Sequence, residues 1–211
     1  MPSDTTKLSS KKTIGDWRAI QPMLESGASP EIWDGVLRDY YYDRLRTRYL
    51  EPIKAVKNLH FFKCRKPEGE GFAIVAIQCS LVEFLESCFL GINYKRKKPT
   101  LPYEYGESGT VFVSFLCNRA PFNGCFTDEA LAWDFYDSVR CGVLHEARTK
   151  GAWLIHAKSE SSLIVDPAGP ILYRDDFQEA IVKFIEDYRA AVPQKIKLQQ
   201  AVIRKFEHLC I

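Results

Sequence analysis

Apolar residues recur at helical spacing along most of the chain. Between residues 72 and 93 they lie almost all round the predicted helix, which is typical of a central bundle helix or a dimer interface. Residues 130–148 form a second amphipathic segment, in which Phe135, Tyr136 and Val139 belong to the apolar stripe. Further helices are predicted at 30–58, 175–188 and 196–209.

Strand-like alternation is confined to a short region before the penultimate helix. It covers Trp153–Ala157, Ser162–Asp166 and Ile171–Arg174, with a turn at 167–170. A short apolar segment at 111–117 ends in a loop that contains Pro121 and Gly124. The pattern therefore predicts a mainly α protein, a helical bundle with a small β-hairpin or meander insertion.

Helix boundaries follow from capping residues. Ser29 and Pro30 are expected to begin one helix and Thr127 to cap the helix at 130–148. Asp175, with Gln178, is expected to open the penultimate helix. Pro52 should kink or divide the first of these helices.

The chain divides into four expected segments. These are a disordered leader at 1–12, an N-terminal helical extension at 13–68, a helical core at 69–190 and a C-terminal helix at 191–211.

Composition limits the class of protein. Of 211 residues, 46% are hydrophobic and 27% charged, as in ordinary globular proteins. The net charge of +2 does not indicate a general polyanion binder, so any nucleic-acid site must be local. The seven cysteines form no CxxC pair, which suggests a reducing compartment and gives no metal or cofactor motif. Gln78, Glu83 and Glu86 interrupt the apolar helix, so no membrane span is expected and the location is predicted to be cytoplasmic.

The segment 130–148 carries Arg140 and His145, five positions apart. Arginine is a permanently charged planar group that binds phosphate oxygens, and histidine exchanges a proton near neutral pH. On an ideal helix, residues five apart differ by about 140° around the axis. The two side chains share a face only if the helix is distorted, which Gly142 would permit, or if two copies meet in a symmetric dimer.

A purely structural interpretation is also open. Arg140 would then pair with Asp137, and His145 would be a partly buried histidine with its hydrogen bonds satisfied. Glu83 and Glu86 either pair with Arg140 or orient His145, or else they mark the solvated stripe of the apolar helix. Glu83 is the preferred member of a catalytic set, because apolar residues surround it on both sides.

Three cations are candidate RNA contacts: Arg148 and Lys150, which follow the motif, and Lys97, which belongs to a separate loop. Lys97 belongs to a basic run at 95–98, for which a solvated loop is the commoner role. The aromatic and arginine-rich segment 40–49 either stacks bases or faces a core or dimer partner, and we prefer the second role.

The order of these elements resembles the HEPN superfamily, the α-helical RNA-cutting and RNA-binding domains of prokaryotes. The resemblance covers about residues 70–188. It depends on the apolar helix at 72–93, the segment 135–147 with its Arg-x4-His spacing, and the closing helix at 176–188. Cys141 stands where asparagine or aspartate is frequent in the family, and Ala147 where one toxin branch has tyrosine.

The resemblance implies a metal-independent endoribonuclease of a toxin or phage-defence system, acting as a homodimer without a cofactor. His145 would be the general acid and base and Arg140 would hold the scissile phosphate. RNA and a cognate antitoxin or regulatory protein would be its partners. The alternatives are an inactive HEPN-like module that binds RNA or a nucleotide or dimerises, and an unrelated helical protein in which the motif is a coincidence.

Overall fold

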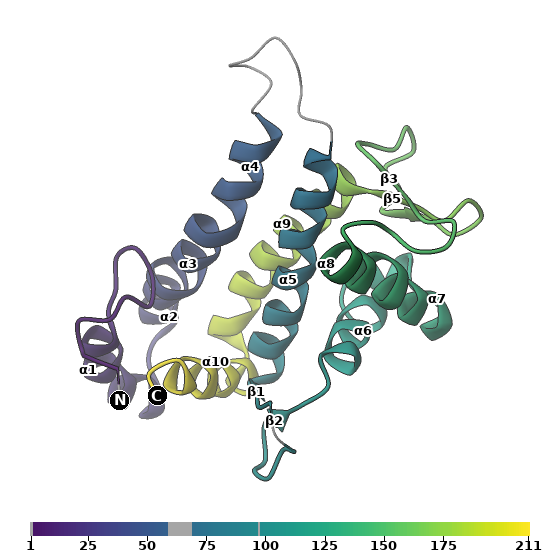
Figure 1. Cartoon of the computed structure of the whole chain (residues 1–211). Helices are drawn as coiled ribbons and strands as arrows, with labels where there is room; N and C mark the ends of the chain where they lie inside the picture. The colour runs from purple at the N-terminus through teal and green to yellow at the C-terminus, as the bar shows by residue number, and fades with distance from the viewer. Residues whose placement is uncertain (1, 59–68, 97) are drawn as a thin grey trace. The chain divides into compact units, whose positions relative to one another are not determined.

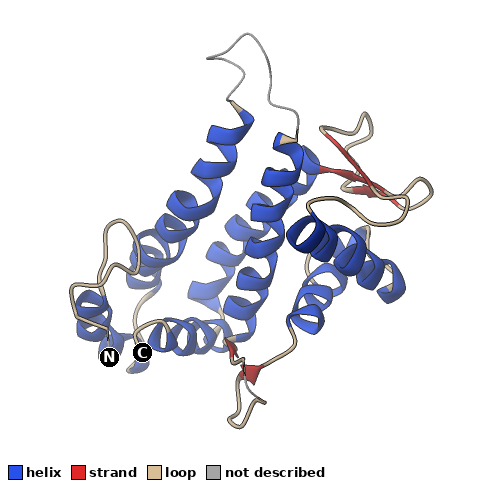
Figure 2. Ribbon diagram, in the orientation of Figure 1, coloured by secondary structure: helices blue, strands red, loops and turns tan. Residues whose placement is uncertain are grey.

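The structure is a computed structural model that describes residues 2–58, 69–96 and 98–211. It is mainly helical, so the predicted fold class is confirmed (Figure 2). The α-helices are α1 Ile14–Glu25, α2 Pro30–Val36, α3 Asp43–Leu45, α4 Glu51–Lys57, α5 Glu70–Leu90, α6 Ser108–Asn118, α7 Glu129–Asp134, α8 Gly142–Glu146, α9 Arg174–Ala191 and α10 Ile196–His208 (Figure 1). The strands are β1 Asn93–Tyr94, β2 Glu104–Tyr105, β3 Leu154–His156, β4 Val165–Asp166 and β5 Ile171–Tyr173.

The described residues belong to two compact units. Unit 1 consists of Met1–Glu51, Ser87–Gly106 and Ile185–Ile211, and unit 2 of Pro52–Glu86 and Glu107–Phe184. This division differs from the expected succession of an extension, a core and a C-terminal helix, because each unit combines segments that are far apart in the sequence.

The core of unit 1 is aromatic. Trp17 of α1 stacks on Phe206 of α10 with ring centroids 4.9 Å apart, and Tyr40 meets Trp17 edge-on at 5.3 Å. Tyr41 lies 5.2 Å from Tyr188 of α9. All five side chains are buried. The preferred structural role of the segment 40–49 therefore holds for Tyr40 and Tyr41.

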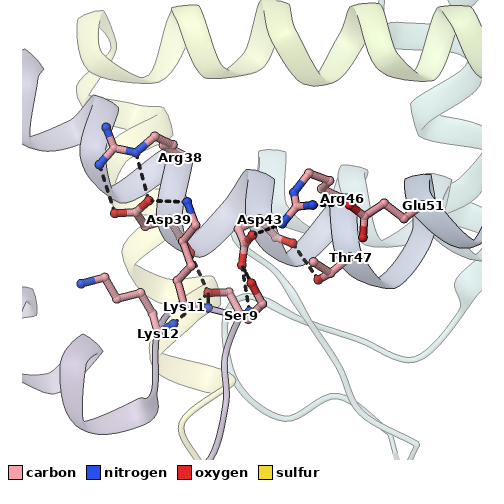
Figure 3. Close-up of polar contacts among 10 residues, drawn as sticks. Ser9, Lys11, Lys12, Arg38, Asp39, Asp43, Arg46, Thr47 and Glu51 are labelled. Atoms are coloured by element: carbon pink, nitrogen blue, oxygen red, sulfur yellow. Dashed lines mark hydrogen bonds and ion pairs between the residues drawn. The ribbon is translucent and has the colours of Figure 1, made fainter.

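Residues 2–12 do not form the expected disordered leader. Leu8 and Ser9 are each only 2% exposed. Ser9 donates its hydroxyl to the backbone oxygen of Asp39 at 2.6 Å, and Ser10 donates its N–H to the Asp43 carboxylate at 2.8 Å (Figure 3). The segment is ordered because Leu8 is buried and because its polar groups find acceptors on the helix that follows α2. Its polar composition does not reveal either contact.

Pro52 does not divide the helix that begins at Pro30. Two π-helical segments, η1 Leu37–Tyr42 and η2 Arg46–Leu50, join α2, α3 and α4 without a break. At the end of η2 the N–H of Glu51 donates to the carbonyl of Arg46, five residues back. Because Pro52 has no N–H to donate, this wider turn accommodates it within the helix.

The core of unit 2 surrounds Phe135. Its ring centroid lies 5.3 Å from those of Phe126 and Trp153, and 5.8 Å from that of Phe177. The short apolar segment at 111–117 is part of helix α6, and its Phe112 stacks on Phe135 at 6.1 Å.

Helix α5 is long and apolar enough to cross a membrane by length and composition alone. However, its Val75, Leu81 and Val82 are fully buried within the protein, and so is Glu86. A core helix meets the same criteria, so the burial of these side chains agrees with the wide apolar surface of α5. Among the described residues, α5 is the one helix that meets these criteria, and a single such helix is weak evidence for a membrane span.

The β insertion lies before α9, as predicted, but it is not a meander. Strands β4 and β5 form an antiparallel hairpin, and β3 pairs in parallel with the other edge of β5, so the strand order is β3-β5-β4. A second, unpredicted pair is formed by β1 and β2, which run parallel.

Two helix starts differ by one residue from the expected ones. Asp128, rather than Thr127, caps α7, and its carboxylate accepts from the Ala130 N–H at 2.9 Å. Helix α9 begins at Arg174, and Asp175 instead forms an ion pair with Lys57 at 2.8 Å. Such shifts are common because local patterns fix helix ends poorly.

Candidate functional site

Arg140 lies within a continuous helix in unit 2, in which the π-helical segment η5 (Phe135–Cys141) joins α7 to α8. At the end of η5 the N–H of Gly142 donates to the carbonyl of Asp137, five residues back. Inside α-helices, π-helical turns are frequent at functional sites. The helix is therefore distorted, as convergence would require, but the π-helical segment ends at Cys141, and the rest of the interval up to His145 is ordinary α-helix.

Glu83 of α5 and Tyr136 hold the Arg140 guanidinium. Its Nη2 lies 3.4 Å from Oε2 of Glu83, and its Cζ lies 5.3 Å from the centre of the Tyr136 ring. Only 16% of the Arg140 side chain and 18% of the Glu83 side chain are exposed. Salt screens charges at this burial less than it screens surface charges. Of the two expected partners, Glu83 and not Glu86 is the one that pairs with Arg140.

Much of the donor capacity of Arg140 remains unused. Apart from Glu83, its polar contact among the described residues is a weak one from Nη1 to the sulfur of Cys141, at 4.0 Å, and its Nε is buried without a hydrogen-bond partner. A guanidinium carries five N–H donors and matches the geometry of phosphate oxygens. The group can therefore accept an anion without first losing a complete set of protein contacts.

Tyr136 is a site residue that the sequence analysis assigned only to the apolar stripe. Its hydroxyl lies 3.0 Å from that of Ser108, and its ring lies 5.4 Å from Phe112. Burial raises the pKa of Tyr136, so its phenol stays neutral near pH 7. The sequence feature that could have identified Tyr136 as a neighbour of Arg140 is its position four residues earlier on the same helix.

Glu86 has a separate, structural role. It is fully buried and accepts from Arg119 at 2.8 Å and 3.0 Å and from the Ser114 hydroxyl at 2.8 Å. Buried carboxylates need such partners. The alternative of a solvated stripe is therefore wrong for Glu86.

His145 lies on α8 and is exposed to solvent. No hydrogen bond or ion pair joins its imidazole to another described residue. The expectation of a partly buried, satisfied histidine is therefore wrong. The expected pair between Arg140 and Asp137 is also absent, because Asp137 instead pairs with Lys150 at 3.3 Å. Within one chain, the structure does not bring Arg140 and His145 together.

The helix ends at Glu146, one residue after His145. Ala147 is in the left-handed conformation with φ 55°, and its N–H donates to the carbonyl of Gly142. The chain then runs back against the helix, where a Cβ on Gly142 would lie 2.6 Å from the Arg148 carbonyl oxygen. The absence of a side chain at Gly142 therefore allows the backbone at Arg148 to pack against the helix. His145 lies in the last turn before this reversal of the chain.

The predicted RNA contacts near the motif are paired with surface carboxylates. Arg148, 71% exposed, lies 3.3 Å from Glu146, and Lys150 lies 3.6 Å from Glu146. Surface pairs contribute little to stability, so phosphates can replace these carboxylates at small cost. Lys97 lies outside the described residues.

Comparison with known proteins returns no match, whether against family models, curated proteins or solved structures. Within the described ranges, no three His, Cys, Asp or Glu side chains are grouped so that they would hold a metal ion. The candidate site is therefore defined by the Arg140 cluster and by the exposed His145.

Proposed function

We propose that the protein is a metal-independent endoribonuclease of the HEPN type that acts as a homodimer in the cytoplasm. One observation carries the proposal. A mostly buried guanidinium with unused donors, held by Glu83 and Tyr136, lies about one helical turn before an exposed imidazole. The toxin or defence role, with a cognate antitoxin or regulatory protein as partner, rests on the family resemblance alone.

The chemistry follows from these two groups. Arg140 binds the non-bridging oxygens of the scissile phosphate and stabilises the charge that develops on them. His145 removes the proton of the ribose 2′-hydroxyl, and the 2′-oxygen attacks phosphorus. The bond to the 5′-oxygen breaks, and that oxygen takes a proton from an imidazolium. The products are a 2′,3′-cyclic phosphate and a 5′-hydroxyl, and DNA is not cleaved because it lacks the nucleophile.

A second copy would complete the site. Arg140 faces Glu83, whereas His145 faces solvent, so the imidazole of one copy is proposed to meet the guanidinium of the other. Leu144 beside His145 is 43% exposed and Trp133 of α7 is 40% exposed. Exposed apolar residues of this kind favour coverage by a partner surface.

The test is cleavage of a labelled single-stranded RNA in EDTA, with wild-type protein and with His145→Ala and Arg140→Ala. Loss of a positioned acid and base lowers the rate by about 10²–10⁴-fold. His156→Ala is the matched control, because His156 is an exposed histidine in the same unit. We expect it to cleave like wild type, to give cyclic phosphate ends, and to leave a 2′-deoxy substrate intact.

Intact RNA with dimeric wild-type protein, or equal cleavage by His145→Ala, contradicts the proposal. The separation of Arg140 from His145 in one chain favours a second candidate, an inactive module that binds RNA or dimerises. That module predicts no cleavage, RNA affinity that survives His145→Ala, and RNA affinity that falls with Arg140→Ala. Light scattering of the wild type measures the dimer in either case.

A further inference from the structure

A groove on unit 1 has the lining expected of a site for a flexible polyanion. Its volume is about 720 Å³. It is lined by three cationic side chains, Lys195, Lys197 and Arg204, and by no acidic one. Lys195 and Lys197 are exposed at the start of α10, whose first turn contains no acidic residue. The groove is therefore a local positive site on a protein of almost balanced charge.

Tyr103 and Arg204 form a flat platform in this groove. The Arg204 guanidinium lies 4.1 Å from the centre of the Tyr103 ring. It also donates to the carbonyl of Gly91 at 3.3 Å and to that of Leu90 at 3.2 Å, which fixes its plane. Tyr103 is 53% exposed, so part of the ring remains available to a ligand.

The backbone at Tyr103 is strained. Its φ is 66°, a left-handed conformation that is unusual for a bulky residue. Such strain clusters at binding sites. The mostly exposed ring therefore takes its position at a conformational cost.

Gly91 allows α10 to approach closely enough to form the groove. A Cβ at Gly91 would lie 2.6 Å from Cα of Ala201 and 2.7 Å from Nη2 of Arg204. The close approach brings Arg204 to the end of α5. The floor beside it is apolar, with Leu90 37% and Ile196 71% exposed.

We infer that this groove binds a segment of single-stranded RNA. Bases stack on the Tyr103 and Arg204 platform and on the apolar floor, while Lys195 and Lys197 bind phosphates. Exposed apolar surface between cations fits the flat bases of RNA better than the side chains of an acidic peptide. The choice of RNA as the polyanion rests on the proposed function, but binding in the groove does not require cleavage.

The positive region has a limit on one side. A neighbouring groove of about 450 Å³ shares Ile196 and Arg204 but adds Glu25 and Glu207. These carboxylates repel phosphates, so the strand is expected to turn away from them. The β1–β2 loop, which also carries Tyr103, has two exposed cations, Arg96 and Lys98.

The experiment measures binding of a fluorescein-labelled oligouridylate of about 10 nucleotides by anisotropy. The full chain carries His145→Ala in EDTA, so that cleavage does not interfere. Affinity is measured between about 50 and 200 mM salt for Lys195→Gln/Lys197→Gln. Loss of two phosphate contacts should make the negative slope of log K against log salt less steep, by about 1.4. The control, Lys7→Gln/Lys54→Gln, changes net charge equally at two exposed lysines elsewhere and should leave the slope unchanged.

Stacking is tested at Tyr103. Tyr103→Asn tolerates the left-handed backbone but removes the ring, and should weaken binding about fivefold or more. Tyr103→Phe keeps the ring and should bind like the parent. Circular dichroism and thermal unfolding exclude misfolding as the cause of any loss.

The inference is overturned if oligouridylate does not bind, or if the groove and control variants have the same slope. It is also overturned if polyglutamate competes as well as RNA at equal ionic strength. Failure of the proposed function is distinct: wild-type protein would leave RNA intact while the groove variants still lose affinity. Conversely, if the wild-type protein cleaves RNA normally and the groove variants bind RNA with unchanged affinity, only the proposal of RNA binding in the groove is rejected, and the proposed function stands.

Discussion

Gly142 and Arg148 are in backbone contact, and the carbonyl oxygen of Arg148 occupies the space where a side chain at position 142 would begin. A Cβ built on Gly142 would lie 2.6 Å from that oxygen. The atom in the way is backbone, so it cannot rotate aside as a flexible side chain can. The contact links the last helical turn, which carries His145, to the segment that follows it.

Gly142→Ala is therefore expected to destabilise the protein by about 1–3 kcal/mol through overpacking. Urea unfolding followed by circular dichroism measures the change. Gly124→Ala is the control, because no heavy atom lies within 4 Å of a Cβ at that position. Equal stability of the two variants would show that the backbone at Arg148 is not packed against the helix at Gly142.

The ion pair of Glu83 and Arg140 should be measurable by a double-mutant cycle with Glu83→Gln and Arg140→Gln. Because both side chains are mostly buried, we expect a coupling energy of about 0.5–3 kcal/mol in the free energy of unfolding. The exposed pair of Lys158 and Glu179 is the control, for which no coupling is expected. Additive effects at Glu83 and Arg140 would mean that the pair does not position the guanidinium.

Asp43 should make the attachment of the N-terminal segment sensitive to acid. Burial acts to raise the pKa of Asp43, but hydrogen bonds from Ser10 and Arg46 outweigh it and lower the pKa to about 2. The unfolded value is about 3.9, so the stabilisation is complete above that pH and is lost as the pH falls towards 2. The stability difference between wild type and Asp43→Asn should shrink over this range.

Acid titration of unfolding free energy gives that difference, and NMR titration gives the carboxyl pKa directly. Asp34→Asn, on the exposed surface of α2, should leave the acid limb of the stability curve as it is in wild type. A stability difference for Asp43→Asn that does not vary between about pH 5 and pH 2 would contradict the low pKa.

The buried thiols of α5 should be inert in the folded protein. Burial raises the pKa of Cys79 and of Cys88 to about 12, and only the thiolate reacts with iodoacetamide. At pH 8 we expect no labelling of either residue until urea unfolds the protein. Cys125 and Cys141, which are partly exposed, are the internal controls. Peptide mass spectrometry measures each site, and labelling of Cys79 as fast as Cys141 would contradict its burial.

Local patterns predicted much of the secondary structure. The wide apolar surface at 72–93 predicted the long helix α5, and the alternation at 153–174 predicted strands before the penultimate helix. The helix that carries Arg140 was also predicted. These features depend on residues close in the chain, so hydrophobic spacing is sufficient to identify them.

The sequence also provided the residues of the candidate site, but not their arrangement. Glu83 and Glu86 were both candidate partners of Arg140. In the folded protein Arg140 pairs with Glu83, because Glu86 already forms an ion pair with Arg119. The outward position of His145 and the order of the Leu8 segment depend likewise on groups that meet after folding.

By itself, then, the sequence determined the mainly helical class, the long apolar helix α5 and the helix carrying the Arg-x4-His spacing. Only the tertiary structure decided the parallel pairing of β3 with β5, the π-helical turns, the Arg140 cluster and the groove at Tyr103 and Arg204. The physical reason is that hydrophobic period reports which face of each element is buried. It does not report which distant charges, rings and backbone atoms come to lie against that face.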